Sequence, residues 1–186
     1  MNLARLLAAI SFLLMTGIAL SAESAAAGHG KESNCIDQWK ERTAALAAED
    51  WPQLSRIAER YIKTCKGVFG TESYSVAYEE AAIALNNLGK ASQALSASDK
   101  CIGAFYANSA CHVQRAQALA TLEKYTQAHA ALDKADRLIT HAIEVGQRDL
   151  NGAKNSLERE LFEARLGHLA AQRSHASAIR DRYFPK

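Results

Sequence analysis

The chain has 186 residues, of which 48% are hydrophobic and 23% are charged. This length and apolar content suit one globular or solenoid domain with a continuous core. The formal net charge is only +2 and the charges form no long runs, which argues against binding to nucleic acid or to an anionic membrane surface. Because the chain has two prolines and is rich in alanine and leucine, we expect an all-α protein.

Residues 1–22 have the pattern of a secretory signal peptide. Arg5 supplies a positive charge, and an uncharged apolar stretch runs from Leu6 to Leu20. Cleavage is expected after Ser21 or Ala22, where the side chains are small. The alternative is an uncleaved membrane anchor, for which this stretch is short, since a span takes about 20 residues. The mature chain is therefore expected to be periplasmic or secreted, without a membrane span.

The mature chain is expected to begin with a flexible leader, residues 23–34, which is rich in Ala, Gly and Ser. Four cysteines follow, namely Cys35, Cys65, Cys101 and Cys111. An even number of cysteines in an oxidising compartment favours structural disulfides. Their spacing matches neither a zinc site nor a haem attachment signal.

Helical periodicity begins near Cys35, and its apolar positions are Ile36, Trp39, Thr43, Leu46 and Ala47. Asp50 is a plausible N-cap for a second helix, which has Pro52 in its first turn and ends at Cys65. Residues 67–73 are predicted to form a loop. Within it, Val68 and Phe69 either pack against the first hairpin or form an exposed contact point.

Two more helical hairpins are predicted downstream. One pairs residues 74–88 with 91–105, and the other pairs residues 110–122 with about 125–145. Ser109 is the expected N-cap of the third hairpin. The pattern then resumes from Asp149 to Leu169, with a break or a bend at Asn151-Gly152 and a short final helix after Ser174. These C-terminal helices are expected to cover the last hairpin.

The second and third hairpins repeat the same pattern at a distance of 34 residues. The matching pairs are Ala82 with Ala116, Leu88 with Leu122, and Ala94 with Ala128. A fixed period of this length is typical of helix–turn–helix arrays. These residues resemble the tetratricopeptide repeat (TPR) family from Tyr78 to Ala135. Two features depart from the family pattern, because no proline closes either repeat and alanine replaces the early glycine.

The resemblance implies a right-handed solenoid of about three hairpins over residues 35–147, with capping helices over residues 148–186. It also implies that the first helices of the hairpins line a concave face. The positions that match this face are Trp39, Thr43, Glu79, Ile83, Asn86, Asn87, Gln114, Gln117 and Thr121. Such an amide-rich face suits hydrogen bonding to an extended peptide. The alternative is that Asn86 and Asn87 only form a solvated helix end.

The hairpins that the resemblance implies also pair the cysteines. Cys35 begins one helix and Cys65 ends its antiparallel partner, whereas Cys101 ends one hairpin and Cys111 begins the next. Of the three connectivities that four cysteines allow, Cys35–Cys65 with Cys101–Cys111 is therefore preferred.

The sequence has weak signals for chemistry. His168 and His175 are seven residues apart, whereas metal-binding pairs on one helix are usually four apart, so a solvated face is the favoured interpretation. His112 adjoins Cys111, but a nucleophile needs a free thiolate. The chain contains no nucleophile elbow, phosphate loop or dinucleotide fingerprint. We predict a non-enzyme with no metal or cofactor.

These observations predict an exported adaptor, monomeric or weakly dimeric, that binds a protein or peptide partner through its concave face. An alternative is a structural subunit of a cell-envelope or secretion assembly, held by its convex face or its C-terminal helix. A third and least favoured hypothesis is an enzyme that uses Cys111 and His112.

Overall fold

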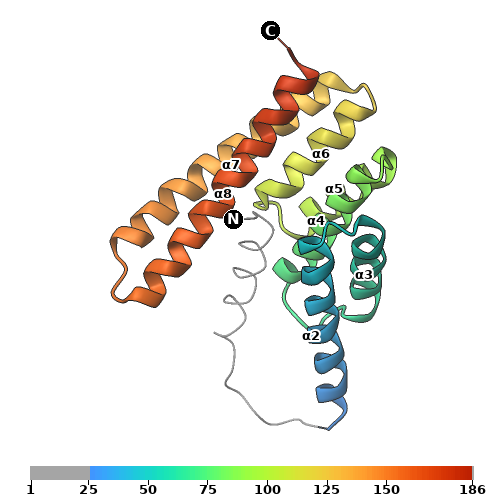
Figure 1. Cartoon of the computed structure of the whole chain (residues 1–186), viewed down its shortest axis with the longest axis vertical. Helices are drawn as coiled ribbons and strands as arrows, with labels where there is room; N and C mark the ends of the chain where they lie inside the picture. Colours follow the sequence, from blue (N-terminus) through green and yellow to red (C-terminus); the bar gives the residue numbers. More distant parts are fainter. Residues whose placement is uncertain (1–25, 186) are drawn as a thin grey trace.

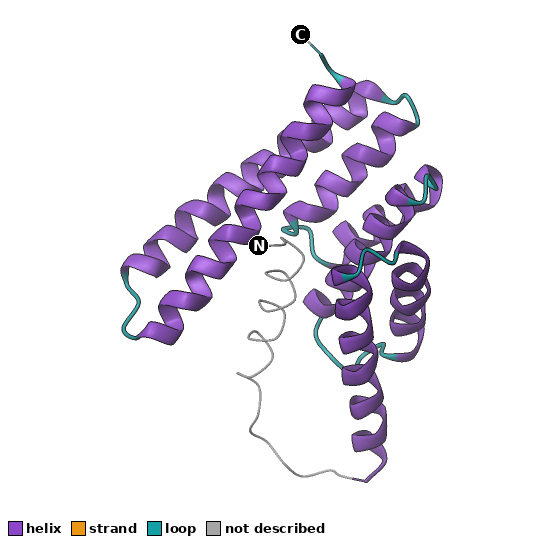
Figure 2. Cartoon of the chain, in the orientation of Figure 1, coloured by secondary structure: helices purple, strands orange, loops and turns teal. Residues whose placement is uncertain are grey.

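The computed structural model describes residues 26–185, and within this range the secondary structure consists of helices alone (Figure 2). The predicted signal peptide and its cleavage site lie outside the described residues. Figure 1 shows the order of the helices along the chain. Their bounds are α2 (Ala26–Ala47), α3 (Trp51–Thr64), α4 (Thr71–Asn87), α5 (Ala91–Ala104), α6 (Ser109–Thr121), α7 (Tyr125–Asn151) and α8 (Ser156–Tyr183). The all-α prediction is confirmed for this part of the chain.

Three hairpins have the same turn between their helices. In each turn one residue has a positive φ: 55° at Glu49, 71° at Gly89 and 58° at Glu123. The next residue donates its N–H to a carbonyl five positions earlier, at 2.9 Å in all three turns. This is the Schellman arrangement that ends many helices. The first hairpin therefore has the same turn as the later two, although its sequence matches them weakly and Glu49 takes a conformation that glycine adopts more easily.

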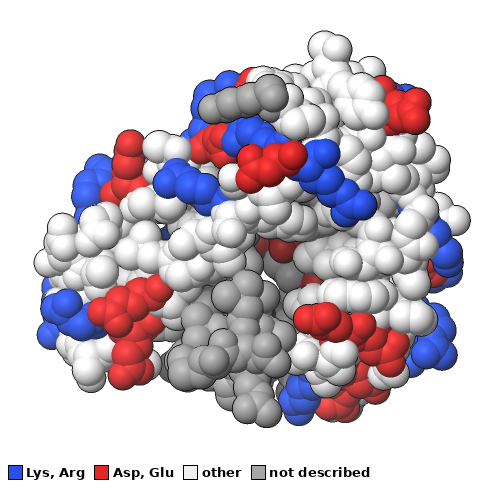
Figure 3. Space-filling model, turned by 45° about the horizontal axis from the view of Figure 1, so that its top comes forward, with Lys and Arg blue, Asp and Glu red and all other residues white. Residues whose placement is uncertain are grey.

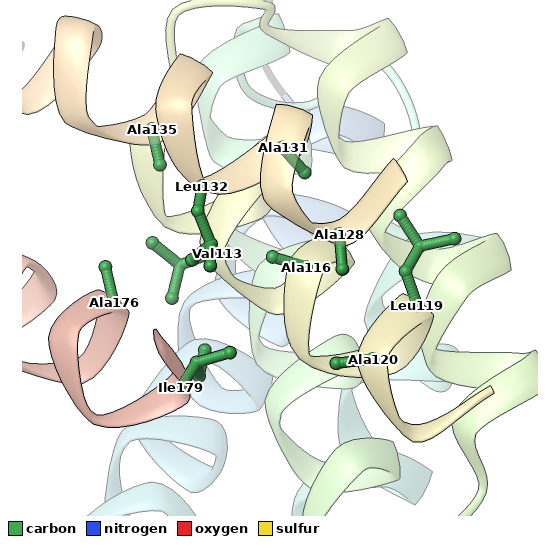
Figure 4. Close-up of a cluster of buried hydrophobic side chains, with 10 residues drawn as sticks. All are labelled: Val113, Ala116, Leu119, Ala120, Ala128, Ala131, Leu132, Ala135, Ala176 and Ile179. Carbon is green, nitrogen blue, oxygen red and sulfur yellow. The ribbon is translucent and has the colours of Figure 1, made fainter. Parts of the chain in front are cut away.

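The helices pack mainly on their neighbours in the chain, and two pairs of alternate helices are also in contact. α4 packs on α6 as well as on α3 and α5, and α6 packs on α8 as well as on α7. Figure 4 shows the largest buried cluster, where side chains from α6, α7 and α8 meet. Most of them are alanines, and Val113, Leu119, Leu132 and Ile179 fill the larger gaps. Small residues allow the helix axes to come close, which explains why alanines recur at the repeat period.

Several helix boundaries differ from those predicted. Residues 26–34 of the expected leader, 23–34, belong to α2, which the Cys35–Cys65 disulfide and the contact of Lys31 Nζ with the Lys66 carbonyl hold against the end of α3. The N-cap of α6 is Asn108, whose side chain accepts a hydrogen bond from the N–H of Ala110. Ser109, the predicted cap, is the first helical residue instead.

The C-terminal helices also differ from the prediction. The break at Asn151-Gly152 is complete, so α7 continues to Asn151 and α8 starts at Ser156. Asn155 caps α8 by accepting a hydrogen bond from Glu158 N–H at 2.9 Å. α8 then runs to Tyr183 without interruption, and no separate final helix exists within the described residues. None of the helices in residues 26–185 combines the length and apolarity that a membrane crossing requires.

Both predicted disulfides are confirmed. Cys35–Cys65 joins α2 to the end of α3 with 5.7 Å between the Cα atoms, and Cys101–Cys111 joins α5 to α6 with 5.9 Å. Val68 and Phe69 pack against the buried cluster around the first disulfide, so the burial interpretation of this loop is confirmed. Covalent links thus hold α2 to α3 and α5 to α6, whereas α7 and α8 have none.

Candidate protein-interaction face

The predicted face comprises residues from three helices. α2 contributes Trp39 and Thr43, α4 contributes Glu79, Ile83, Asn86 and Asn87, and α6 contributes Gln114, Gln117 and Thr121. Asn87 and Thr121 are exposed, Gln114 is buried, and the remainder are half-buried. Figure 3 shows one side of the molecule, on which acidic and basic side chains are interspersed over the surface of the described residues.

Asn86 links the α4 and α6 parts of the face. Its Nδ2 donates to the backbone oxygen of Gln114 at 3.0 Å and to the side-chain Oε1 of Gln114 at 2.9 Å. Asn86 is therefore a structural contact between helices and not a solvated helix end. Asn87 fits that interpretation better, because it is exposed and its amide donates to the carbonyl of Ile83 one turn earlier.

Glu79 fixes the loop between α5 and α6. Its Oε2 accepts a hydrogen bond from Asn108 Nδ2 at 2.9 Å, and the same amide lies 3.0 Å from Ser75 Oγ. Burial raises the pKa of Glu79, although the Asn108 hydrogen bond and the nearby Arg42 charge both lower it. The carboxylate is held in place in a site that disfavours its charge.

Beside Glu79 lies a buried ion pair that the sequence analysis missed. Arg42 in α2 and Glu80 in α4 are 1% and 5% exposed, and Arg42 Nε lies 2.6 Å from Glu80 Oε2. The contact is an ion pair whose angle does not suit a hydrogen bond. The guanidinium also stacks on the Tyr61 ring, 4.3 Å from its centroid. Burial raises the pKa of Glu80 to about 7, with Arg42 opposing the shift and Glu79 adding to it.

The buried side of α2 matches the apolar periodicity only in part, because the predicted Trp39 and Leu46 pack against buried clusters but remain half-buried. Cys35, Gln38, Arg42 and Ala45 face inward, whereas Ile36, one of the predicted apolar positions, is 40% exposed. The inward positions recur at helical spacing. Two of them are polar, so hydrophobic periodicity detects only part of this face. The spacing from Cys35 to position 42, two turns later, is the signal that identifies it.

α8 borders the α6 part of the face. His175 Nε2 lies 3.1 Å from Gln117 Oε1, and the Tyr183 hydroxyl lies 3.2 Å from Thr121 Oγ1. At the start of α6, Ser109 Oγ donates to Gln172 Oε1 at 2.6 Å. α8 therefore packs along α6 as well as α7, and its polar side chains adjoin the predicted face.

The histidines and cysteines have structural contacts. Cys111 forms a disulfide with Cys101, so it offers no thiol to the buried His112 next to it. Burial lowers the pKa of His112, and His112 Nε2 lies 3.1 Å from the Tyr106 carbonyl oxygen. His168 contacts Gln172 at 2.7 Å. Within the described part of the chain, no three His, Cys, Asp or Glu side chains come together as metal ligands.

Comparison with known proteins adds no assignment, since the chain matches no protein-family model, no curated protein and no solved structure.

Proposed function

We propose that this protein is an exported, TPR-like helical solenoid that binds a protein or peptide partner through the face formed by α2, α4 and α6. The 34-residue period, the three identical turns and the contacts between alternate helices support the solenoid. Two disulfides support an oxidising compartment. The signal-like pattern of residues 1–22 supports export.

The contact between Asn86 and Gln114 is the observation that carries the binding proposal. It joins the polar stripes of α4 and α6 into one surface, with a hydrogen bond that positions both amides. Half-buried polar side chains on a rigid helical scaffold can exchange hydrogen bonds with an extended backbone at little entropic cost.

Site-specific photo-crosslinking in intact cells tests this function. A benzoylphenylalanine residue is placed at Asn87 or at Ile83 on the proposed face, and at the exposed Glu160 or Arg165 of α8 as controls. We expect the same protein adduct from both face positions and none from the controls. Adducts only at the α8 positions contradict the proposal.

That second outcome favours the alternative function, a structural subunit of an envelope or secretion assembly. One observation supports this alternative: α7 and α8 extend beyond α6 (Figure 1), and Leu157 near the start of α8 is 54% exposed. In this alternative, the exposed leucine at the end of the two-helix extension is the apolar docking contact of the assembly.

The export proposal has its own test, which is the mass of the protein recovered from the cell envelope and culture medium. Cleavage after Ser21 or Ala22 predicts a mature chain that begins at Ala22 or Glu23. A full-length protein that begins at Met1 and stays in the membrane fraction contradicts cleavage and indicates an anchor.

A further inference from the structure

The charges around Glu79 do not balance. Glu79 and Glu80 are consecutive carboxylates on α4, and among the described residues Arg42 is the cation that acts on both. Arg42 is committed to Glu80, since the two side chains are buried together at 2.6 Å. When both carboxylates are ionised, their two negative charges share the one positive charge of Arg42, and Glu79 is the carboxylate that makes no ion pair with it.

Glu79 is also the member of the cluster that a partner can reach. It is half-buried, whereas Arg42 and Glu80 are almost completely buried. Asn108 supplies one neutral hydrogen bond to Oε2, which compensates only part of the cost of removing a carboxylate from water. A cation brought to this position is therefore more favourable than water alone, since charge-assisted hydrogen bonds are about twice as strong as neutral ones.

A second acceptor on the same stripe lacks a donor. Asn86 Oδ1 is shielded from solvent and has no hydrogen-bond partner, because the Asn86 amide nitrogen makes both contacts to Gln114. Asn86 lies seven residues after Glu79, which is about 10 Å along a helix. That distance corresponds to roughly three residues of an extended strand. Of these two acceptors, the half-buried Glu79 is the one that a partner can reach, so Glu79 decides the chemistry of the ligand.

We propose that the α2–α4–α6 face selects an extended peptide segment of its partner that places a lysine or arginine side chain at Glu79. The inference depends on the proposed function, since it names the chemistry of the partner for that same face. The cationic side chain pairs with the Glu79 carboxylate and balances the cluster, while the peptide backbone lies along α4 towards Asn86.

The first test uses a library of random ten-residue peptides with acetylated N-termini, selected on the folded, disulfide-bonded chain. Acetylation removes the terminal ammonium, so only side chains can supply the cation. We expect the bound peptides to be enriched in lysine or arginine. Bound peptides without that enrichment overturn the inference but leave the proposed function standing. Failure to enrich any peptide counts against this inference and against the proposed function. In that case the photo-crosslinking experiment tests the proposed function independently.

The second test measures the best peptide and its lysine-to-norleucine analogue by fluorescence anisotropy. Wild-type protein is expected to bind the analogue about tenfold or more weakly, as the loss of a charge-assisted hydrogen bond predicts. The variant Glu79→Gln keeps an oxygen for Asn108 and is expected to bind both peptides equally. Glu72→Gln, an exposed change in the first turn of α4, is the matched control and retains the wild-type preference. A lysine preference that survives Glu79→Gln overturns the assignment of Glu79.

Discussion

The N-terminal hairpin α2–α3 and the C-terminal hairpin α7–α8 are held in opposite ways. A disulfide closes the first, and the buried Arg42–Glu80 pair fastens it to α4. The second has no covalent link. A buried apolar cluster and hydrogen bonds such as Ser109–Gln172 hold it to α6, and its ion pairs, Arg180 with Asp133 and Asp136, are partly exposed. The buried pair makes the first hairpin sensitive to the loss of one partner, whereas partly exposed pairs and neutral contacts each contribute little to the second.

The substitution Arg42→Met, in the first hairpin, is expected to have the largest effect on stability. The change leaves the Glu80 carboxylate buried without its cation, and we expect a loss of roughly 3–5 kcal/mol in the free energy of unfolding at pH 8. Urea denaturation measures it. The matched control is Lys40→Met on the same helix, whose exposed ion pair with Asp37 contributes little. If adding Glu80→Gln to Arg42→Met restores no stability, the unpaired charge is not the cause.

Removal of a disulfide is expected to have the second-largest effect on stability. Replacing Cys35 and Cys65 together by serine opens a 30-residue loop and is expected to cost roughly 2–4 kcal/mol. The same replacement at Cys101 and Cys111 opens a loop of only 10 residues, so its cost is expected to be smaller. Thermal and urea unfolding of both double variants at the same pH shows which variant loses more stability. A larger loss for the second pair contradicts the chain-entropy explanation.

The pH dependence of stability is a further difference between the N-terminal and C-terminal parts of the chain. The pKa of Glu80 is raised from 4.5 to about 7, so the folded state binds a proton that the unfolded state releases between these values. Its contribution to stability is present below pH 4.5 and is lost as the pH rises through 7. We expect Glu80→Gln to remove about 2–3 kcal/mol of pH dependence between pH 5 and pH 8. Glu72→Gln is expected to leave the profile unchanged.

The stability contributions of His112, which is buried, and His168, which is half-buried, change with pH in the opposite direction. Burial lowers the pKa of His112 and His168 below the ordinary value of 6.5. Their contribution is present above that value and is lost as the pH falls through it. His168→Gln is therefore expected to lose less stability than the wild type between about pH 7 and pH 5. A profile parallel to the wild type at these pH values contradicts a lowered pKa of His168.

The smallest expected effect is on the second hairpin. Ser109→Ala removes the hydroxyl that donates to Gln172 at 2.6 Å, and we expect a loss of about 1 kcal/mol. Hydrogen exchange should become faster in α8 and remain unchanged in α2 and α3, because the contact fastens only α8 to α6. The exposed Ser174→Ala in α8 serves as the control. Equal acceleration in α2 indicates global unfolding instead.

Local patterns made much of this fold predictable. Asp50, followed by Pro52, marks the start of α3, and its side chain caps that helix by accepting from Gln53 N–H. Gly89 marks the turn between α4 and α5 because it takes a positive φ readily. The turn at Glu123 has no glycine, but the 34-residue period locates it. The cysteine pairing followed from the positions of the helix ends.

The candidate face was less predictable. Its residues could be listed by matching positions, but the role of each one depends on a neighbour from another helix. The sequence allows two interpretations of Asn86, and the contact of Asn86 with Gln114 decides between them. Arg42 was missed because apolar periodicity carries no information about a buried cation, and its burial requires Glu80 from α4 and Tyr61 from α3.

By itself, the sequence determined most of the helices and their turns, because caps, propensities and periodicity act within a few turns of the chain. Only the tertiary structure decided how far α2 and α8 extend, which polar residues of α2 face inward, and how the charges around Glu79 are paired. The last two features depend on the desolvation of polar groups at contacts between helices, and that cost appears only when residues distant in sequence are brought together.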